Sequence, residues 1–415
     1  MTQVRHSTKT SIVLGAGIMG CSLALFLARG GHRVILVDES MKPMNGASRW
    51  NEGKIHLGFL YGADPSLNTA RKLLPGGLNF CSLVEELIEQ PVRDEWVTQH
   101  NDRYLVHRDS VVPTEPYLAT AHGIQQLVQQ HPDASRYFVD LRPSVVRELS
   151  RETLEAEYDS SIIKSGIEVP ERSVATQPIA DALAGAVAAH PKVELHLSRR
   201  VVGVQSRDSS CGPWEVQCED RAEGQTRVIG AGDFVFNATW HGRIAIDATL
   251  NRPRPQSWTH RYRLSGFIRL KEATTLRSAV IAVGPFGDVK NYNGRDLYVS
   301  WYNHGLVAET NDLDPRSQNL PKLTDSEILN AKFKTLAKII PDLASIRSNI
   351  SSSELRGGWV YAAGKGPLED ASSELHRRDR IGIERHGTYF SIDTGKYSIA
   401  PWLARQVVAG VFSEW

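Results

Sequence analysis

The chain has 415 residues, and its 48 lysines and arginines against 47 aspartates and glutamates leave a formal net charge of +1 at pH 7. This length predicts two domains, or one elaborated domain, around a sizeable buried core. The near-zero charge provides no global field to recruit nucleic acid or an anionic membrane, and no apolar run reaches the roughly 18 residues of a membrane span.

The first predicted elements form a strand, a turn and a helix. An apolar strand over residues 11–14 runs into a glycine-rich turn, a helix over 21–29 follows, and a second apolar strand over 34–37 ends at Asp38. The first glycine permits a tight turn, the second lets the backbone approach a pyrophosphate, and the third lets helix and strand pack closely. Free N–H groups at the helix N-terminus favour phosphate. We expect the whole turn to contact a dinucleotide, namely Gly15, Ala16, Gly17, Ile18, Met19 and Gly20.

Asp38 stands 18 positions after Gly20, close to the roughly 20 expected of an acid that reaches a ribose hydroxyl. We therefore predict that Asp38, Glu39 and Ser40 lie at the ribose end of the bound dinucleotide.

Residues 46–61 form a loop that is too rich in glycine and mixed polar groups to be an ordinary connector. Here the chain resembles the D-amino-acid oxidase-like superfamily of FAD-dependent oxidoreductases, whose loop of the form G-A-S-x-x-N-x-G lies against the flavin. The N-x-G-x-I-H-x-G variant most resembles the branch that includes L-2-hydroxyglutarate oxidase. The resemblance implies FAD as cofactor. The contacts that it implies in this loop are Gly46, Ala47, Ser48, Arg49, Asn51, Gly53, Lys54 and Ile55.

The resemblance continues through a second block. A helix is predicted over 177–190 and strands over 193–198 and 201–207, a part in which the family presents backbone groups to the adenine, here at Val202. A hairpin over 214–230 and a buried strand over 233–239 follow. That strand resembles the family's V-x-N-A-x-G element, which implies cofactor contacts from three residues, Asn237, Ala238 and Thr239. Trp240-His241-Gly242 replaces the usual glycine, so the backbone path after the strand stays open.

A third block, residues 387–401, precedes a helix that runs to about residue 411. In the family this block delivers a helix N-terminus to the flavin pyrimidine ring, where it stabilises the anionic reduced flavin. The contacts that this implies are Thr394, Gly395, Lys396 and Tyr397. Lys396 stands where the family usually carries glycine and histidine, and it either assists the same anion, interacts with oxygen, or is a solvent-facing turn lysine.

The fold class we predict is α/β, with a Rossmann-like FAD-binding domain and an inserted α+β substrate domain built on a mixed sheet. We expect the FAD-binding domain to comprise residues 1–92, 158–250 and 350–415, and the substrate domain to comprise residues 93–157 and 251–349. The elements expected in the substrate domain are strands over 95–107, 261–270, 278–283 and 297–301 and helices over 117–130 and 325–340.

Five side chains are candidates for catalysis or substrate binding. Tyr298 and Tyr302 can wall a pocket and donate hydroxyl hydrogen bonds, or simply pack in the sheet. Arg356 can clamp a carboxylate with two hydrogen bonds, or form a surface salt bridge. His56 can act as a base, attach the flavin covalently, or bond the backbone, and we favour a polar role beside the flavin. Lys396 completes the set.

The resemblance and the site chemistry together predict an FAD-dependent oxidase or dehydrogenase. It would remove a hydride from a carbon bearing an amine or a hydroxyl group, in an amino acid, a secondary amine or a 2-hydroxy acid, and pass the electrons to oxygen or another acceptor. Alternatives that stay open are an NAD(P)H-dependent flavin monooxygenase or halogenase, a nicotinamide-only dehydrogenase, and an RNA-modifying or assembly protein that holds FAD as a structural ligand. No nucleic acid and no integral membrane contact are expected, and the sequence leaves the oligomeric state undetermined.

Other chemistry lacks support in the sequence. GxSxG and HExxH motifs are absent, and we predict no metal site. The four cysteines show no C-x-x-C spacing, which predicts reduced thiols, although Cys211 and Cys218 can meet across a hairpin. His241 and His386 have no acidic partner at suitable sequence spacing, so we expect structural or solvent roles. Residues 1–9 lack an apolar stretch, and we expect no secretory signal and a cytoplasmic location.

Overall fold

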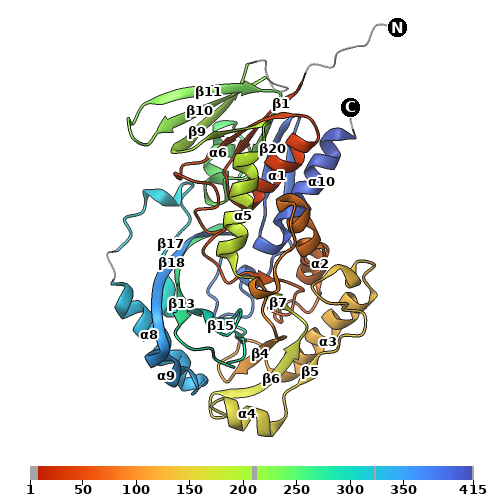
Figure 1. The fold of residues 1–415 in the computed structure, drawn as a ribbon, viewed down its shortest axis with the longest axis vertical. Coiled ribbons are helices and arrows are strands. Elements are labelled where there is room, and N and C mark those ends of the chain that lie inside the picture. Colours follow the sequence, from red (N-terminus) through yellow and green to blue (C-terminus); the bar gives the residue numbers. More distant parts are fainter. Residues whose placement is uncertain (1–7, 208–212, 322–323, 414–415) are drawn as a thin grey trace.

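The computed structural model describes residues 8–207, 213–321 and 324–413. Its two main sheets divide the molecule. A parallel sheet lies in the upper half of Figure 1 with α1 (Ile18–Arg29), α5 (Thr176–Ala189) and α10 (Ala400–Phe412). A mixed sheet lies in the lower half with α8 (Asp325–Ile339) and α9 (Leu343–Ile346). The predicted α/β class, with a Rossmann-like sheet and a mixed substrate-domain sheet, is confirmed. Cys211 lies outside the described residues, whereas Cys21, Cys81 and Cys218 are free thiols.

The parallel sheet is built on the strand, turn and helix at the start of the chain. The four central strands of this sheet are mainly apolar and almost fully buried because both faces are covered, as parallel sheets require, whereas the two edge strands are more exposed. Only the edge strand β19 runs antiparallel. The strands, in spatial order, are β19 (Gly382–His386), β20 (Tyr389–Asp393), β12 (Phe234–Asn237), β1 (Thr10–Leu14), β2 (Arg33–Val37) and β8 (Val193–His196).

Helices cover one face of the parallel sheet and a small antiparallel sheet covers the other. Ile12 and Leu14 of β1 point toward the small sheet, while Val13 points toward the helices, which is the alternation of a strand with two buried faces. The helices are α1 (Ile18–Arg29), α5 (Thr176–Ala189) and α10 (Ala400–Phe412), and the small sheet contains β9 (Arg199–Ser206), β10 (Trp214–Asp220) and β11 (Thr226–Gly232). The predicted hairpin is confirmed as β10 and β11.

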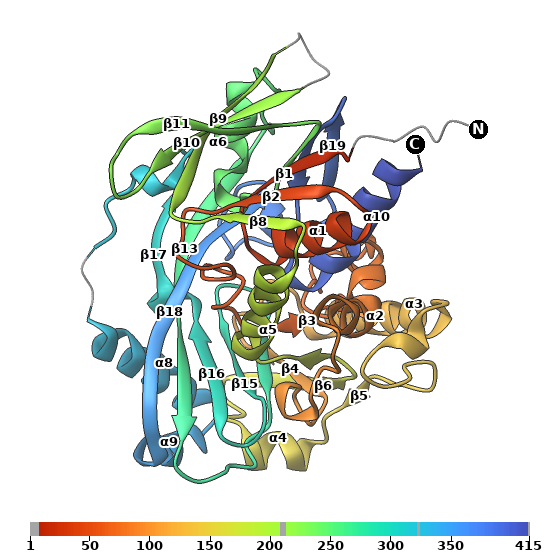
Figure 2. The same ribbon diagram turned by 45° about the horizontal axis from the view of Figure 1, so that its top comes forward.

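The mixed sheet forms the second half of the molecule. In Figure 2 the long strand β18 runs beside β13, and residues 258–270 pair with residues 350–363 along this length. The strands, in spatial order, are β17 (Leu306–Thr310), β13 (Trp258–Leu270), β16 (Asp296–Trp301), β15 (Gly287–Asn291), β14 (Ala279–Ala282), β4 (Asp102–His107), β6 (Ile163–Val169) and β5 (Arg147–Glu148), with β18 (Ile350–Ala363) paired to β13. The predicted strand over 95–107 is wrong in its first part, because residues 94–96 form a 3-10 turn and β4 begins at Asp102.

The remaining elements surround these sheets. A two-stranded ribbon joins β3 (Lys54–Ile55) of the glycine-rich loop to β7 (Arg172–Ser173). Among the described residues, no helix combines the length and apolar character needed to cross a bilayer. The other α-helices are α2 (Asn68–Ile88), α3 (Thr114–Gln130), α4 (Arg151–Glu157), α6 (Arg243–Thr249), α7 (Tyr302–Gly305), α8 (Asp325–Ile339) and α9 (Leu343–Ile346).

Helix α2 is the longest helix and was not predicted, because Pro75, Gly76 and Gly77 in its interior are helix breakers in sequence. Tertiary packing explains the two glycines. A Cβ at Gly76 would lie 2.6 Å from Ile399, and a Cβ at Gly77 would lie 2.3 Å from the carbonyl oxygen of His56. The glycines therefore let α2 approach the loop that carries His56.

The domain boundaries remain a proposal. Strand β6 pairs with β4, and β18 pairs with β13, although both β6 and β18 fall in segments that we expected in the FAD-binding domain. On this pairing we propose that the chain crosses between the domains near residues 170 and 364 rather than at 158 and 350.

Candidate active site

A cavity of about 400 Å³ runs from the glycine-rich turn to the edge of the mixed sheet. Three blocks of sequence that lie far apart in the chain converge on this groove. The residues that line it are Gly15, Ala16, Gly17, Ile18, Met19, Asp38, Glu39, Ser40, Asn45, Gly46, Ala47, Ser48, Asn51, Glu52, Lys54, His56, Ala238, Thr239, Trp240, His241, Tyr262, Arg316, Gly357, Gly358, Trp359, Val360, Thr394, Gly395, Lys396 and Tyr397.

The glycine-rich turn leaves no room for side chains. Gly15 has φ +92°, and a Cβ there would lie 2.7 Å from the carbonyl oxygen of Ala238. A Cβ at Gly20 would lie 1.7 Å from the carbonyl oxygen of Gly15, which explains the close packing of α1. At Gly17 the nearest atom is the Ser48 hydroxyl oxygen, which also accepts a 2.9 Å hydrogen bond from the backbone N–H of Ile18. Gly17 therefore lines the groove without a side chain of its own, at the N-terminus of α1.

Two acidic side chains lie at one end of the groove. Asp38 accepts hydrogen bonds from the backbone N–H groups of Ala16 (2.6 Å) and Ser40 (2.7 Å), and burial raises the pKa of its carboxyl despite these bonds. Glu39 accepts a 2.7 Å hydrogen bond from Arg316 and lies 3.7 Å from His241. Burial alone would raise the pKa of Glu39, but these two partners lower it to about 2.

A histidine and a lysine lie at the opposite end. His56 is 2% exposed, and its Nδ1 has no hydrogen-bond partner within the described residues. Its ring centroid is 5.9 Å from that of Tyr61, and the Lys396 ammonium lies 5.6 Å from the same tyrosine ring. Burial, followed by the positive charges of Lys396 and Lys54, holds the pKa of His56 well below 6.5, so the imidazole is neutral at pH 7.

Buried ion pairs tie this end of the groove to the mixed sheet. The Lys54 ammonium lies 3.4 Å from the Asp288 carboxylate, and Lys290 pairs with Asp102, with neither of the latter side chains exposed. Burial works against the charge of Lys54, but the surrounding carboxylates outweigh it and raise the pKa of Lys54. Glu171 accepts a 2.6 Å hydrogen bond from the backbone N–H of Leu57, next to His56. The loop is therefore held rigidly beneath the sheet.

Comparison with known proteins decides the family. The family model described as "FAD dependent oxidoreductase" (DAO) matches residues 11–376. The chain belongs to the DAO family of FAD-dependent oxidoreductases. No curated protein matches in sequence.

Solved structures share the fold of this DAO-family chain at low sequence identity. Glycine oxidase from Geobacillus kaustophilus is 16% identical with a TM-score of 0.65, over 98% of this chain and 95% of that one. Iminodiacetate oxidase from Chelativorans sp. BNC1 is 16% identical with a TM-score of 0.66, over 97% and 95%. L-α-glycerophosphate oxidase from Mycoplasma pneumoniae, with FAD bound, is 14% identical with a TM-score of 0.62, over 99% and 95%.

The groove suits the cofactor of the DAO family. A glycine-rich turn at the N-terminus of α1 matches a pyrophosphate, and the acids at one end match a ribose. Of the predicted cofactor contacts, most line the groove, and six do not: Gly20, Arg49, Gly53, Ile55, Val202 and Asn237. No group of three or more histidine, cysteine or acidic side chains in the described segments is arranged to hold a metal ion.

Several of those six residues shape the groove from behind. Gly53 has φ +65°, and a Cβ there would lie 1.8 Å from the carbonyl oxygen of Val174. Asn237 donates 2.9 and 3.0 Å hydrogen bonds to Asp247 and to the carbonyl of Arg243, which fixes the end of β12. Arg49 forms two hydrogen bonds with Asp181 instead of facing the groove. The side chain of Ile55 is buried, and that of Val202 is exposed.

Three predicted substrate residues also lie off the groove lining. Tyr298 shares a 2.9 Å hydrogen bond with the Ser265 hydroxyl, and the Tyr302 hydroxyl accepts a 2.9 Å hydrogen bond from Arg261. Arg356 is exposed, bonds Glu354 at 3.0 Å and lies over the ring of Trp50. The structure therefore brings together His56 and Lys396, and it places Arg356 in the surface ion pair that was its alternative reading.

Several groove residues could not be predicted from the sequence, because only the tertiary structure brings them to the groove. Trp240 takes a left-handed φ of +58° and donates a 3.0 Å hydrogen bond to the carbonyl of Trp359, which settles the backbone path after β12. Tyr262 of β13 packs on Trp359, with ring centroids 5.3 Å apart. His241, for which we expected no acidic partner at suitable sequence spacing, lies 3.7 Å from Glu39 because the fold brings together residues that are far apart in the sequence.

Proposed function

We propose that this FAD-dependent oxidoreductase removes a hydride from a carbon bearing an amine or a hydroxyl group. The observation that carries the proposal is the neutral, buried His56 with an unpartnered Nδ1, next to Lys396, where the groove meets the mixed sheet. A neutral imidazole can accept the proton that leaves a hydroxyl or an ammonium group.

Each part of the site has a role in this chemistry. Bound FAD supplies the acceptor for the hydride and its two electrons. His56 holds the proton released by the substrate, at a nitrogen without a hydrogen-bond partner among the residues that the structure describes. The positive charge of Lys396 stabilises negative charge that develops at this end of the groove.

The relatives support both donor classes. Glycine oxidase and iminodiacetate oxidase are named for amine substrates, whereas L-α-glycerophosphate oxidase is named for an alcohol. The loop motif around His56, which resembles the branch that includes L-2-hydroxyglutarate oxidase, adds 2-hydroxy acids to the candidates. We further propose a cytoplasmic location, and oxygen or another small acceptor for the electrons.

The test begins with the absorbance spectrum of the purified protein before and after acid precipitation, which shows whether flavin is present and whether it separates from the chain. Anaerobic mixing with amino acids, N-methyl amines and 2-hydroxy acids follows, and a true substrate bleaches the flavin absorbance. Rapid bleaching by NADPH without substrate would instead support a monooxygenase. Bound flavin that no donor reduces would support a structural role for FAD.

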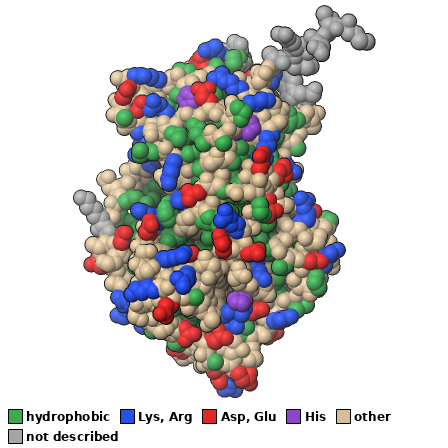
Figure 3. All heavy atoms as spheres, viewed as in Figure 1, with side chains coloured by type: hydrophobic (Ala, Val, Ile, Leu, Met, Phe, Trp, Pro, Cys, Tyr) green, Lys and Arg blue, Asp and Glu red, His purple; other side chains and the backbone are tan. Residues whose placement is uncertain are grey.

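Charge on the visible surface gives no support to an RNA-binding role. Figure 3 shows lysine and arginine side chains mixed with aspartate and glutamate over this face, without a patch of one sign. Such a surface lacks the basic stripe expected for a nucleic-acid backbone.

A further inference from the structure

Arg261 on β13 is a buried cation without a counter-ion. It is 4% exposed, and among the described residues its guanidinium donates one hydrogen bond, to the Tyr302 hydroxyl at 2.9 Å. Arg243 is equally buried but lies 3.4 Å from Asp247 and 3.9 Å from Asp393. No carboxylate oxygen of the described residues lies within 4.0 Å of the Arg261 guanidinium. Because an unpaired buried charge is costly, this position calls for an anion that the protein itself does not supply.

Two more guanidinium groups share this region. Arg263 lies over the Tyr302 ring, 4.7 Å from its centroid, while Arg261 lies 5.8 Å from the same centroid. The Arg378 guanidinium donates hydrogen bonds to two backbone carbonyls, those of Leu375 and Arg377. Within the described residues, neither Arg263 nor Arg378 has a carboxylate at ion-pair distance. Burial lowers the pKa of Arg261, and the charges of Arg378 and Arg263 lower it further.

The three arginines adjoin the groove. Arg261 pairs in register with Val360, and Arg263 pairs with Gly358, and both of these partners line the groove. The positive charge of Arg378 also contributes to the low pKa of His56. The arginines are therefore neighbours of the proposed catalytic end and not a separate surface cluster.

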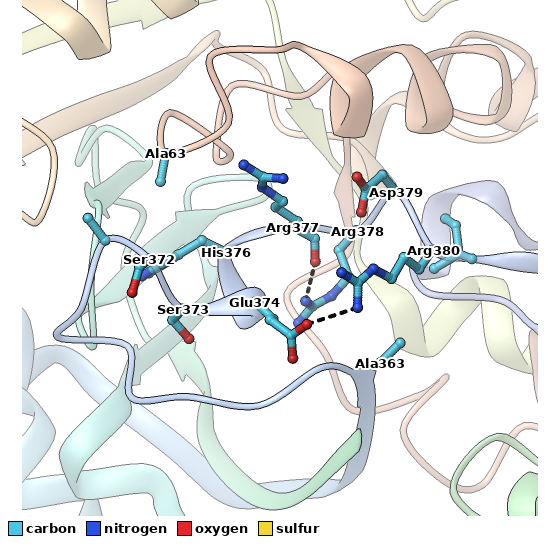
Figure 4. Close-up of a pocket in the computed structure, with 12 residues that line it drawn as sticks. Ala63, Ala363, Ser372, Ser373, Glu374, His376, Arg377, Arg378, Asp379 and Arg380 are labelled. Carbon is cyan, nitrogen blue, oxygen red and sulfur yellow. Dashed lines mark hydrogen bonds and ion pairs between the residues drawn. The ribbon is translucent and has the colours of Figure 1, made fainter. Parts of the chain in front are cut away.

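A second cavity, of about 190 Å³, is lined in part by Arg378 (Figure 4). Arg380 is neutralised there by Glu374 at 2.9 Å, and Arg377 extends toward Ala63. Ile381, which also lines this cavity, packs against the groove residue Gly395, where a Cβ would lie 2.4 Å from its side chain. Ile381 thus lies between the two cavities, and Arg378 lines the second one.

We propose that Arg261, Arg263 and Arg378 form a subsite for a carboxylate or phosphate group, and that the substrate is a small alcohol carrying such a group rather than a zwitterionic amine. This inference rests on the proposed function and narrows its donor class. In the reaction the substrate C–H bond breaks and the hydride passes to FAD with both electrons. The hydroxyl proton passes to His56, and the resulting ketone or aldehyde keeps its acidic group.

Charge balance favours the alcohol. An α-amino acid carries an ammonium group together with its carboxylate, so its net charge is zero. It therefore does not neutralise the positive charge of the unpaired arginines. A hydroxy acid or a phosphate ester brings only negative charge, and its oxyanion matches the planar fork of a guanidinium. Lys396, which lines the groove and whose charge acts on His56, repels an ammonium group for the same reason.

The experiment uses the FAD-loaded enzyme with pairs of compounds under anaerobic conditions. The pairs are lactate with alanine, malate with aspartate, and glycerol 3-phosphate with glycerol. We expect flavin reduction by the acidic alcohol of at least one pair and reduction at least roughly 30-fold slower by its partner, the size expected when a charged hydrogen bond is lost. Preference for a carboxylate or for a phosphate identifies which acid the subsite takes.

Variants test the assignment. Arg261→Gln is expected to raise the KM for the acidic alcohol roughly 30-fold, and Arg261→Lys to recover part of that loss. Arg269→Gln is the matched control, because Arg269 is on the same strand but exposed and bonded to Asp296. It should leave the kinetics unchanged.

A thermal titration separates a binding role from a merely structural one. Without ligand, Arg261→Gln should melt at the same temperature as the natural chain or higher, because it removes an unpaired buried charge. Malonate and inorganic phosphate serve as unreactive probes, and at least one of them should raise the melting temperature of the natural chain but not that of the variant.

The outcomes distinguish the inference from the proposed function. Faster flavin reduction by the amino acids would overturn the inference and leave the proposed function intact. If no donor reduces the flavin, the proposed function fails, and the thermal titration still decides the subsite. The subsite would be overturned if malonate and phosphate raised the melting temperatures of Arg261→Gln and the natural chain equally. It would also be overturned if they raised neither melting temperature.

Discussion

The two ends of the groove are built in different ways. At the pyrophosphate end, three glycines stand within six consecutive residues, and a Cβ at Gly15 or Gly20 would collide with backbone atoms. At the proposed catalytic end, His56, Arg261, Arg378 and Lys396 come from three distant parts of the chain. We propose that the first end recognises its ligand by shape and backbone dipoles, and the second by buried charge.

The difference has consequences for stability. Backbone dipoles at a helix N-terminus form part of the secondary structure and need no compensating partner. Buried charges need partners, and the catalytic end has them only in part, as the pairing of Lys54 with Asp288 and the isolation of Arg261 illustrate. We therefore expect substitutions at the first end to act through cofactor retention, and those at the second through rate, substrate and pH.

The largest effects are expected in the glycine turn. Gly17→Ala should abolish flavin binding and change the free energy of unfolding by less than about 1 kcal/mol, because the added Cβ meets only the movable Ser48 hydroxyl. Gly20→Ala should destabilise the chain by about 3 kcal/mol, because its Cβ meets a backbone carbonyl. Flavin content and urea unfolding measure both. Gly185→Ala in α5, which meets open space, is the control and should be neutral or stabilising. Flavin retained by Gly17→Ala would contradict the pyrophosphate assignment.

At the other end, His56→Gln should slow anaerobic flavin reduction by about 10²- to 10⁴-fold, with flavin content unchanged. The exposed His122→Gln is the control, and its flavin should be reduced at the normal rate.

Burial and the charges of Lys396, Lys54, Lys290 and Arg378 keep the pKa of His56 well below 6.5. The rate at pH 6 should therefore stay within about twofold of the rate at pH 7.5. A steep loss of rate toward pH 6 in the natural chain would show that His56 becomes charged there.

A third prediction concerns buried charge in the mixed sheet, away from the groove. Lys332 of α8 is fully buried, its ammonium donates a 3.2 Å hydrogen bond to the Trp301 carbonyl, and burial lowers its pKa to about 7. Below pH 7 both the folded and the unfolded chain carry this charge, so the full burial penalty applies. Between pH 7 and the ordinary value of 10.5 the unfolded chain binds the extra proton, so stability rises with pH.

Lys332→Met should therefore stabilise the chain by about 3 kcal/mol at pH 6, and this gain should shrink toward pH 10. Urea unfolding at several pH values measures it. A gain that does not vary with pH would indicate better packing instead of the removal of a buried charge. Lys338→Met, at the end of the same helix, provides the comparison.

The smallest effect is expected at the ribose end, where shape and charge meet. Arg316→Gln removes the 2.7 Å hydrogen bond to Glu39 and should weaken FAD binding by roughly fivefold, measured by flavin fluorescence. Glu39 has a folded pKa of about 2 against an ordinary 4.5, so its contribution to stability is present above pH 4.5 and is lost as the pH falls toward 2. Between pH 4.5 and pH 2, Arg316→Gln should lose less free energy of unfolding than the natural chain does. Equal losses in the two chains would show that the pairing of Arg316 with Glu39 does not lower the pKa of Glu39.

The accuracy of the sequence predictions follows the same division. The strand, turn and helix around Gly15–Gly20, the hairpin of β10 and β11, and the strand before Ala238 were predicted because each has a local pattern of apolar residues and glycines. Helix α2 was not predicted, since Pro75 and its glycines argue locally against a helix that packing permits. Arg356 was a reasonable candidate anchor by position, yet it is exposed and bonds Glu354.

By itself, the sequence determined the α/β class, the cofactor-binding turn and the resemblance to FAD-dependent oxidoreductases, because these depend on contacts between residues a few positions apart. The tertiary structure alone decided which charged side chains meet. The pairing of β13 with β18 aligns Arg261 with Val360 at the groove, and the fold brings Arg316 and His241 to Glu39. Strand register and burial set these encounters, and neither is encoded in the spacing of any short motif.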